Sequence, residues 1–575
     1  MTISDLAPDL APAITLDDER AAAFVAGVSI ENTGLAVLTT LRSYGIDTIF
    51  GIPGTHNLEF YRHLRRLGIR AVTSRHEQGA GYAADGWGQR RGLPGVVITT
   101  SGPGLLNALS AAGTAYCESR PLILLSPGVA LGDEFADVGT LHETKDATGA
   151  AGAIVEWSRR VTTAAEAVEA VHDAFELFRT GRPRPVHIEV PLDILEQAAD
   201  VDPAQLIARP QPEPSSADVG DVARAAALLA AASRPVILAG GGAARVGSTL
   251  IELAERVGAP VVTTLNGKGS IPESHALAIG AELRLDAARE VANRSDLLLV
   301  IGAKIGEAEL WGGSIDPDGT VVRIDVLRSQ LQKNVASDFG LVGHAEAVVP
   351  QLLAALDGLG HQPAASTWLD LDEVRASCAV EAAGFSPTIA AAAADIAAAI
   401  PADAIVAGDS SQITYLGMTS AVRQDASHSF LYTPAYATLG YGLPSAIGAR
   451  VADPSTPVVC VVGDGALMFA VQEFATAVEQ RLDLTVVCVD NSGYGEIRQN
   501  EIDRGIDPIG VELAQPDWAA LADAFGGRGH RVVDRAEVRE TIARAVANPG
   551  VDLVHIPLAV YRDALSAASD LEQDR

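Results

Sequence analysis

The feature that most constrains the fold of this chain is a strand–helix–strand pattern between residues 458 and 491. Val458 to Val462 is a short run of β-branched residues suited to a buried parallel strand, and Leu484 to Val489 is a second such run. Two parallel strands joined through a helix end at the same edge of their sheet, so the residues after each strand are expected to lie together. The intervening helix is predicted from apolar residues at helical spacing, namely Leu467, Phe469, Val471, Phe474, Ala475 and Val478.

Residues that can supply oxygen ligands follow both strands. Asp464 follows the first, within Gly463-Asp464-Gly465-Ala466, and Asn491 follows the second. One carboxylate and one amide carbonyl suit Mg²⁺, which keeps near-octahedral oxygen coordination and takes further ligands from substrate phosphates. Free backbone N–H groups around Gly465 and Ala466 favour the same phosphates. The pattern therefore predicts a magnesium–diphosphate site, and an ordinary turn in which Asp464 caps the helix is the alternative.

This pattern resembles the signature of thiamine diphosphate-dependent enzymes of the acetohydroxyacid synthase, benzoylformate decarboxylase and pyruvate decarboxylase group. The resemblance runs from about residue 30 to 560. It implies that Asp464 and Asn491 bind magnesium through their side chains and Gly493 through its carbonyl. Leu439 resembles the residue that wedges between the two cofactor rings, and a simple core leucine is the competing interpretation. The residues implied to contact the cofactor here are Gly408, Asp409, Ser410, Ser411, Leu439, Gly463, Asp464, Gly465, Ala466, Asn491, Gly493, Tyr494, Gly495 and Glu496.

A second match lies far upstream, in Arg75-His76-Glu77-Gln78-Gly79. The resemblance implies that Glu77 bonds the aminopyrimidine nitrogen of the cofactor and promotes the form that removes the thiazolium C2 proton. Such a role needs an apolar setting, because desolvation raises the pKa of a carboxyl group. A surface glutamate that caps a helix is the alternative. Gly102 and Asn107 resemble the glycine turn beside the pyrimidine ring.

Three further residues of the first part are candidates for substrate chemistry. Thr55 and His56 stand where some related decarboxylases carry polar groups near C2. His142 is the preferred proton donor or contact for the substrate carboxylate, because histidine titrates near neutral pH, and an exposed loop histidine is the alternative. The motifs around these residues look most like those of 5-guanidino-2-oxopentanoate decarboxylases. A guanidinium substrate needs a carboxylate partner, which Glu496 or Glu143 could supply.

The chain is predicted to be α/β, with three open, doubly wound parallel-sheet domains. A length of 575 residues suits about three or four domains. A disordered acidic arm is expected at 1–28, a pyrimidine-binding domain at 29–198, a central domain at 218–357 and a diphosphate- and magnesium-binding domain at 385–560. The first and last of the three sheets are expected to share a fold.

The resemblance also bears on further cofactors and on assembly. Acetohydroxyacid synthases hold FAD through a glycine- and histidine-bearing loop where this chain has Gly280 to Asp286, and the difference counts against FAD. One end of the thiamine diphosphate matches the first domain and the other end the third. In the family these domains come from different subunits, so a homodimer or homotetramer is expected.

Composition restricts the other partners and the compartment. A formal charge of −31 and a pI near 4.7 oppose binding to nucleic acid or anionic membranes. The start of the chain lacks a secretion signal and no later run is long enough to span a bilayer. Four cysteines without metal-ligand spacing indicate reduced thiols. A cytoplasmic enzyme is therefore expected.

The resulting hypothesis is thiamine diphosphate- and Mg²⁺-dependent, non-oxidative decarboxylation of a small 2-oxo acid to an aldehyde and CO₂, with 5-guanidino-2-oxopentanoate as one candidate substrate. An acetolactate synthase-type carboligase that joins two 2-oxo acids is one alternative. A noncatalytic protein that binds the cofactor is the other. The sequence does not select the 2-oxo acid, because the shape of the substrate pocket depends on loops that no motif positions.

Overall fold

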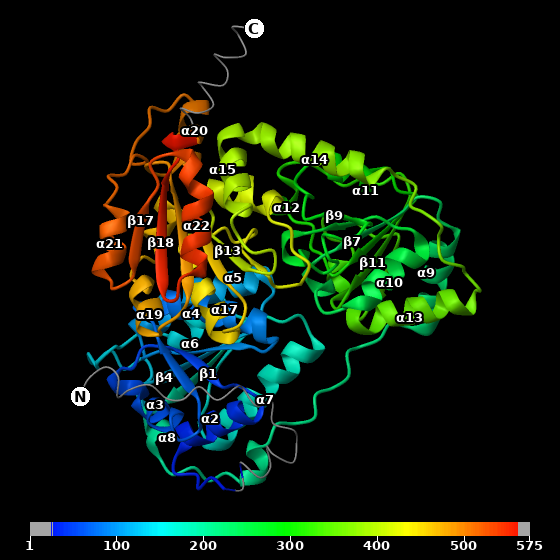
Figure 1. Cartoon of the computed structure of the whole chain (residues 1–575). Helices are drawn as coiled ribbons and strands as arrows, with labels where there is room; N and C mark the ends of the chain where they lie inside the picture. Colours follow the sequence, from blue (N-terminus) through cyan, green and yellow to red (C-terminus); the bar gives the residue numbers. More distant parts are fainter. Residues whose placement is uncertain (1–24, 26, 562–575) are drawn as a thin grey trace.

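Three parallel six-stranded sheets, each with helices on its faces, build the molecule. The computed structural model describes Val25 and residues 27–561. Figure 1 shows the first domain in blue and cyan, the third domain from yellow to red against it, and the central domain in green to one side. The predicted fold class is confirmed. Most of the predicted acidic arm, at residues 1–24 and 26, lies outside the described residues, and Val25 is buried beside Ala36 and Val168.

The first sheet has the strand order β2-β1-β3-β4-β6-β5. Its helices α2 and α7 pack on one another, and α4 and α5 lie toward the third domain (Figure 1). The elements are α2 (Thr33–Ser43), β1 (Thr48–Gly51), η2 (Thr55–Asn57), α3 (Leu58–Leu64), β2 (Arg70–Thr73), α4 (Glu77–Arg91), β3 (Gly95–Ile98), α5 (Pro103–Glu118), β4 (Leu122–Gly128), α6 (Ala147–Gly152), β5 (Trp157–Arg160), α7 (Ala164–Thr180), β6 (Val186–Pro191), α8 (Leu192–Glu196) and η3 (Pro203–Leu206).

The central sheet has a different order, β12-β11-β10-β7-β8-β9. The chain reverses direction across the sheet between β7 and β10, as in doubly wound nucleotide-binding folds. The elements are α9 (Val219–Ala231), β7 (Pro235–Ala239), η4 (Gly241–Ala243), α10 (Ser248–Val257), β8 (Val261–Thr263), η5 (Leu265–Gly267), β9 (Ala278–Gly280), α11 (Asp286–Asn293), β10 (Leu297–Ile301), α12 (Glu307–Leu310), β11 (Thr320–Asp325), η6 (Arg328–Gln330), β12 (Phe339–Val342), α13 (Ala345–Gly358) and α14 (Leu371–Phe385).

The third sheet, β14-β13-β15-β16-β18-β17, repeats the order of the first sheet strand for strand. This repetition agrees with the expectation that the two domains share a fold. The elements are α15 (Pro387–Ala397), β13 (Ile405–Gly408), the π-helix η7 (Ile413–Met418), α16 (Thr419–Ala421), β14 (Phe430–Leu431), α17 (Gly442–Ala452), β15 (Val458–Gly463), α18 (Asp464–Leu467), α19 (Glu473–Glu479), β16 (Leu484–Asp490), α20 (Gly495–Asp503), α21 (Trp518–Ala524), β17 (Arg528–Arg531), η8 (Arg535–Glu537), α22 (Val538–Ala547) and β18 (Val551–Pro557).

The helix predicted from the apolar spacing after Gly465 is not continuous. It divides into α18 and α19, and residues 468–472 form turns between them. Met468 and Phe469 are 47% and 46% exposed, so the apolar periodicity there does not mark a buried helical face. The physical reason is visible at Phe469, whose N–H donates three residues back to Ala466 as in a tight turn.

Alternate residues of the strands face two separate apolar clusters, which is why the strands read as unbroken apolar runs. On β15, Cys460 and Val462 belong to one cluster and Val459 and Val461 to the other. Each fully buried aliphatic side chain contributes about 1.5–3 kcal/mol. A sheet buried on both faces and closed by helices follows from this pattern.

Helices α4 and α17 hold the first and third domains together at a very close crossing, visible where their labels meet in Figure 1. Two glycines permit it. A Cβ on Gly86 would lie 2.2 Å from the carbonyl oxygen of Ser445, and a Cβ on Gly448 would lie 1.8 Å from that of Ala83. The two domains of one chain are therefore packed backbone to backbone. Within the described part of the chain, no helix has both the length and the apolar character that crossing a bilayer requires.

Candidate active site

Three oxygen atoms converge at the carboxyl edge of the third sheet. Asp464 begins α18 directly after β15, while Asn491 and Gly493 follow β16. Asn491 Oδ1 lies 2.8 Å from the carbonyl oxygen of Gly493 and 3.2 Å from Asp464 Oδ1. With Mg–O distances of about 2.1 Å, adjacent ligands of an octahedral magnesium ion lie about 3 Å apart. These spacings could hold a divalent cation.

Two observations favour a bound cation over the alternative, in which the Asn491 amide is turned so that its nitrogen donates to Gly493 and Asp464. Asp464 Oδ2 is buried and has no hydrogen-bond partner among the described residues. In the present orientation Asn491 Nδ2 donates to Gln412 Oε1 at 3.2 Å, a bond that turning the amide would remove. Burial, and then the charge of Asp490, raise the pKa of Asp464 to about 6. A cation at this place would compensate that unfavourable charge.

Asp490 shapes the turn that presents two of these oxygens. Its Oδ1 accepts from the N–H of Ser492 at 2.8 Å, and its Oδ2 pairs with His555 Nε2 on the neighbouring strand β18 at 2.9 Å. Ser492 and Gly493 have φ values of 68° and 145°. Asp490 thus supports the turn from behind and faces away from the three oxygens.

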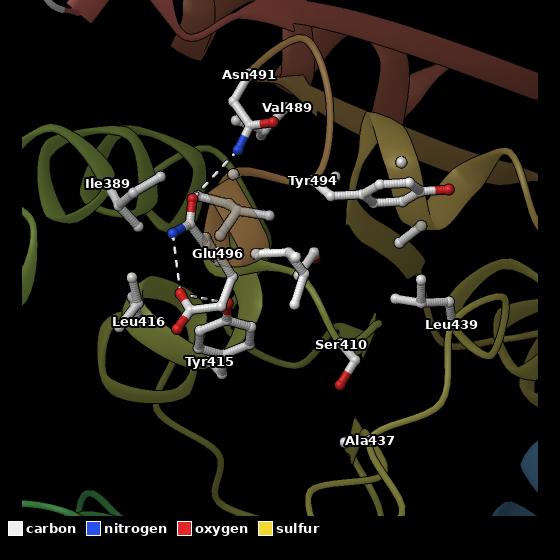
Figure 2. A pocket seen from close by; sticks show the side chains of 18 of the residues that line it. Ile389, Ser410, Tyr415, Leu416, Ala437, Leu439, Val489, Asn491, Tyr494 and Glu496 are labelled. Carbon is white, nitrogen blue, oxygen red and sulfur yellow. Dashed lines mark hydrogen bonds between the residues drawn. The ribbon is translucent and has the colours of Figure 1, made fainter. Parts of the chain in front are cut away.

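A cavity of about 530 Å³ opens from the three oxygens toward the central domain. Figure 2 shows its lining, with a hydrogen-bonded chain that continues from Asn491 through Gln412 to Glu496. Gln412 Nε2 donates to Glu496 Oε2 at 3.1 Å, and the hydroxyl of Tyr415 donates to the same oxygen at 3.2 Å. Of the residues predicted to bind the cofactor, those that line this cavity are Ser410, Ser411, Leu439, Gly463, Asp464, Gly465, Ala466, Asn491, Gly493, Tyr494, Gly495 and Glu496.

Two residues of the third domain that were predicted to contact the cofactor, Gly408 and Asp409, do not line the cavity. Asp409 is buried, and its carboxylate accepts from the N–H groups of Gly440 and Gly442 at 2.9–3.2 Å. It therefore fixes the turn that carries Leu439. A Cβ on Gly408 would lie 2.4 Å from Thr414 Cγ2, so this glycine allows the π-helix η7 to pack closely.

Glu77 lies in the first domain, as the first residue of α4, and is 8% exposed. Asn107 Nδ2 on α5 donates to Glu77 Oε2 at 2.9 Å. The start of the helix is held from the third domain, because Glu473 Oε1 accepts from the N–H groups of Arg75 and His76 at 2.9 and 3.0 Å. The structure thus joins the two predicted residues Glu77 and Asn107 and gives the carboxyl group a buried setting.

The predicted substrate residues of the first domain form one cluster around Ser101. His56 Nδ1 lies 2.6 Å from Ser101 Oγ, and His142 Nδ1 lies 3.4 Å from the same atom. The two imidazole rings meet edge to face with centroids 5.2 Å apart. Burial, and then the neighbouring His142, lower the pKa of His56. Thr55 lies on the same turn η2 and is exposed.

Gly102 allows the loop of His142 to lie close to the turn between β3 and α5. Its φ is 58°, and a Cβ on it would lie 2.4 Å from the carbonyl oxygen of His142. His142 itself has a φ of 63°. A glycine is therefore required where β3 leads into α5, and the backbone there brings the imidazole over Ser101.

The two carboxylates considered for a guanidinium substrate have different surroundings. Both oxygens of Glu143 accept backbone N–H groups of its own loop, from Val138 at 3.1 Å and Gly139 at 2.6 Å. Glu496 instead lines the cavity. Geometry therefore favours Glu496 over Glu143.

Within one chain, the two clusters do not share the cavity. None of the described residues of the first domain lines the space beside Asp464 and Asn491. The prediction that the cofactor joins Glu77 of one subunit to Asp464 of another is not tested by a single chain. It stays a prediction, as does the oligomeric state.

A second cavity, of about 1020 Å³, lies at the carboxyl edge of the central sheet. Gly241 and Gly242 after β7 and Gly302 after β10 line it at the point where the sheet reverses. Asp325, at the end of β11, is held there by both of its oxygens, at 3.0 Å from Arg182 Nη2. The volume and position are typical of a ligand site in an open α/β sheet. The prediction against FAD, made from Gly280 to Asp286, is not tested by this observation.

Four residues of the two clusters were not predicted from the sequence. Two of them were within reach, because Gln412 directly follows the predicted Ser411 and Ser101 directly precedes the predicted Gly102. Arg284 and Trp311 reach the main cavity from loops of the central domain. They lie there only because two domains pack together, which no local pattern encodes.

Comparisons with known proteins agree with this arrangement. Residues 31–150 match the N-terminal TPP binding domain of thiamine pyrophosphate enzymes, 222–352 their central domain and 409–556 their C-terminal TPP binding domain. A probable 2-ketoarginine decarboxylase, AruI, of Pseudomonas aeruginosa is 36% identical over 92% of this chain and 94% of its own length. A probable acetolactate synthase large subunit of Methanocaldococcus jannaschii is 32% identical over 89% of each chain. Acetolactate synthase isozyme 3 large subunit of Escherichia coli is 30% identical over 89% of this chain and 91% of its own length. The chain belongs to the thiamine pyrophosphate enzyme family.

Proposed function

We propose that this enzyme catalyses the thiamine diphosphate- and Mg²⁺-dependent, non-oxidative decarboxylation of a 2-oxo acid, and that 5-guanidino-2-oxopentanoate is its substrate. The observation that carries the proposal is the convergence of three oxygen atoms. Asn491 Oδ1 lies 2.8 Å from the carbonyl oxygen of Gly493 and 3.2 Å from Asp464 Oδ1, which also accepts from the N–H of Asn491 at 3.3 Å. When bound, thiamine diphosphate supplies the carbon nucleophile for the 2-oxo group and accepts the electrons released as CO₂ leaves.

The chain's own residues divide the work between two domains. Asp464, Asn491 and Gly493 would hold the magnesium ion, and the N–H groups at the start of α18 would bind the diphosphate. Leu439, on the turn fixed by Asp409, would support the cofactor from the side. Glu77, buried and hydrogen-bonded by Asn107, would hold a proton at its carboxyl group against the aminopyrimidine.

Histidines of the first domain would handle protons at the substrate. His142 and His56 share the hydroxyl of Ser101, so a proton can pass between the imidazoles through that oxygen. Because the halves of the site lie apart in one chain, a homodimer is the smallest complete unit, and a homotetramer contains two of them. A cytoplasmic enzyme is consistent with four free cysteines.

The substrate assignment rests on two supports. The relative with 36% identity is a probable 2-ketoarginine decarboxylase, and 2-ketoarginine is 5-guanidino-2-oxopentanoate. In this chain, Glu496 places a carboxylate in the cavity where a guanidinium group could make a charge-assisted hydrogen bond.

The acetolactate synthase relatives favour a second candidate, carboligation of two 2-oxo acids. The test is incubation of the purified protein with Mg²⁺, thiamine diphosphate and a panel of 2-oxo acids, with products identified by mass. An aldehyde one CO₂ lighter than the guanidino acid, without bound flavin, is the expected result. Acetolactate from pyruvate would instead establish the carboligase, and cofactor binding without consumption of any 2-oxo acid would establish a noncatalytic protein.

A further inference from the structure

The central domain contributes an aromatic side chain to the cavity of the third domain. Trp311 follows α12 with a φ of 48°, is 39% exposed, and lines the cavity that contains Asp464 and Asn491. Its ring meets that of Tyr415 edge to face, with centroids 6.0 Å apart and planes at 71°. Trp311 therefore continues the wall formed by Tyr415 and Glu496.

Arg284 holds the indole ring of Trp311 in this position. The guanidinium of Arg284 lies 5.2 Å from the Trp311 centroid and 5.7 Å from that of Phe385, and its Nη2 donates to Ser420 Oγ at 2.5 Å. The buried Nε and Nη1 of Arg284 have no hydrogen-bond partner among the described residues, as expected for a cation that faces two aromatic rings.

A second arginine ties the two loops together. Arg289 Nη1 donates to the carbonyl of Arg284 at 2.5 Å and to that of Leu310, the residue before Trp311, at 2.9 Å. The loop of Arg284 and the loop of Trp311 therefore keep a fixed separation. A preorganised ring loses little conformational entropy when a ligand binds against it.

The charges of the cavity point to the kind of ligand. Three of the lining side chains are charged: Arg284, Asp464 and Glu496. Glu282 Oε2 lies 3.6 Å from Arg284 Nη2 and balances its charge, and Asp464 belongs to the oxygen cluster. Glu496 receives bonds from Gln412 and Tyr415 but forms no ion pair within residues 27–561. Burial, and then Glu496, raise the pKa of Tyr415, so its hydroxyl stays a donor.

We propose that Trp311, Tyr415 and Glu496 form the specificity site for the far end of the substrate, and that this site takes a planar cation. The aromatic ring would stack against the cation while the carboxylate accepts its N–H groups. The inference rests on the proposed function for the identity of the whole substrate. It adds Trp311 as a residue that determines specificity.

The experiment compares the holoenzyme with Trp311→Leu, Trp311→Phe and, as a matched control, Trp157→Leu, whose side chain stacks with Arg159 on β5 and lines neither cavity. Two substrates are used, 5-guanidino-2-oxopentanoate and 2-oxohexanoate, whose far end carries no charge. Trp311→Leu should lower kcat/KM for the guanidino acid by about 5- to 30-fold and change that for 2-oxohexanoate by less than about 3-fold. Trp311→Phe should keep most of the discrimination, and Trp157→Leu all of it.

Equal losses on both substrates in Trp311→Leu, with the control unaffected, would overturn the inference and leave the decarboxylase proposal standing. If the wild-type enzyme does not consume the guanidino acid, the proposed function fails instead. The inference is then decided by calorimetry with 5-guanidinopentanoate, which lacks the 2-oxo group. Binding that weakens about 5-fold or more in Trp311→Leu supports the cation site, whereas absent or unchanged binding rejects it.

Discussion

The first and third domains have the same strand order, yet equivalent loops carry different chemical groups. After the third and fourth strands of the third domain, β15 and β16, stand Asp464 and Asn491. After β3 and β4 of the first domain stand Ser101 and the loop of His142. One topology thus offers the same loop positions twice, once with oxygen ligands and once with imidazoles.

The sheet therefore fixes where loop residues stand, and the loop residues themselves determine the chemistry. In both domains the chain reverses between the first and third strands, where an open sheet leaves a crevice. The third domain fills this crevice with acceptors for a cation, and the first fills it with groups that exchange protons near neutral pH. The following predictions test whether the two halves are separable in this way.

The largest effect is expected for Asp464→Ala. Loss of one of two side-chain ligands should weaken magnesium-dependent binding of thiamine diphosphate by more than about 100-fold and make turnover undetectable. Isothermal titration with and without Mg²⁺ measures this. Asp403→Ala, an exposed aspartate at the opposite end of the third sheet, should bind as wild type does. Retention of tight magnesium-dependent binding in Asp464→Ala would contradict the proposed ligand.

Glu77→Gln should separate the two halves most sharply. The amide keeps the size of the side chain but cannot act as a general acid or base, so kcat should fall by about 10²- to 10⁴-fold while the cofactor Kd changes less than about 5-fold. Turnover assays and calorimetry on one preparation measure both quantities. Glu31→Gln, on the surface of the same domain, is the control. A Kd that weakens as much as kcat falls would show that Glu77 binds the cofactor without acting in turnover.

Much of the fold could be predicted because its strands are buried on both faces. β15 and β16 begin at their predicted first residues and each extend one residue beyond their predicted ends. Edge strands gave no such signal, since Trp157–Arg160 and Arg528–Arg531 are polar and only partly buried. The break between α18 and α19 was not predicted, because the exposed Phe469 falls on the same period as the buried apolar residues.

The candidate site could be predicted where function needs a residue type at a strand end. Asp464 and Asn491 fall in this class, since their positions follow from the strands alone. The predicted cofactor contact of Asp409 stays a prediction, because the sequence does not distinguish a buried carboxylate that accepts backbone N–H groups from one that faces a ligand. Trp311 reaches the cavity only because the central and third domains pack together. This packing depends on residues throughout both domains, so no local sequence pattern predicts the position of Trp311.

Each of the equivalent sixth strands, β6 and β18, carries one buried histidine, and the two histidines have different partners. His187 on β6 lies between Ser126 and Ser158, each at 2.7 Å, and burial lowers its pKa to about 3. His555 on β18 has the carboxylate of Asp490 as partner. Unfolded His187 takes up a proton below its ordinary value of 6.5, whereas the folded residue resists it down to about 3. The free energy of unfolding should therefore fall as pH falls through this window, by up to roughly 5 kcal/mol.

The measurement is urea unfolding of the apo protein between these pH limits, with His187→Gln beside wild type. The glutamine keeps a polar side chain but does not titrate, so the stability of the variant should vary less with pH. His361→Gln, a histidine near the end of α13, should retain the slope of wild type. Equal slopes in all three proteins would exclude His187 as a source of acid sensitivity.

The smallest effect is expected at the glycines that directly precede the helices after the third strands, Gly102 before α5 and Gly463 before α18. Gly102 has a φ of 58° and would place a Cβ 2.4 Å from the carbonyl of His142, whereas Gly463 has a φ of −81° and a nearest contact of 3.0 Å to Ser411 Cβ. Gly102→Ala should cost about 1–3 kcal/mol in the apo protein, and Gly463→Ala less, because only the former must strain its backbone and displace a carbonyl. Thermal unfolding of both variants measures the difference. A larger loss for Gly463→Ala would mean that the oxygen-bearing loops of the third domain are the more tightly constrained half, and that the loop of His142 yields easily.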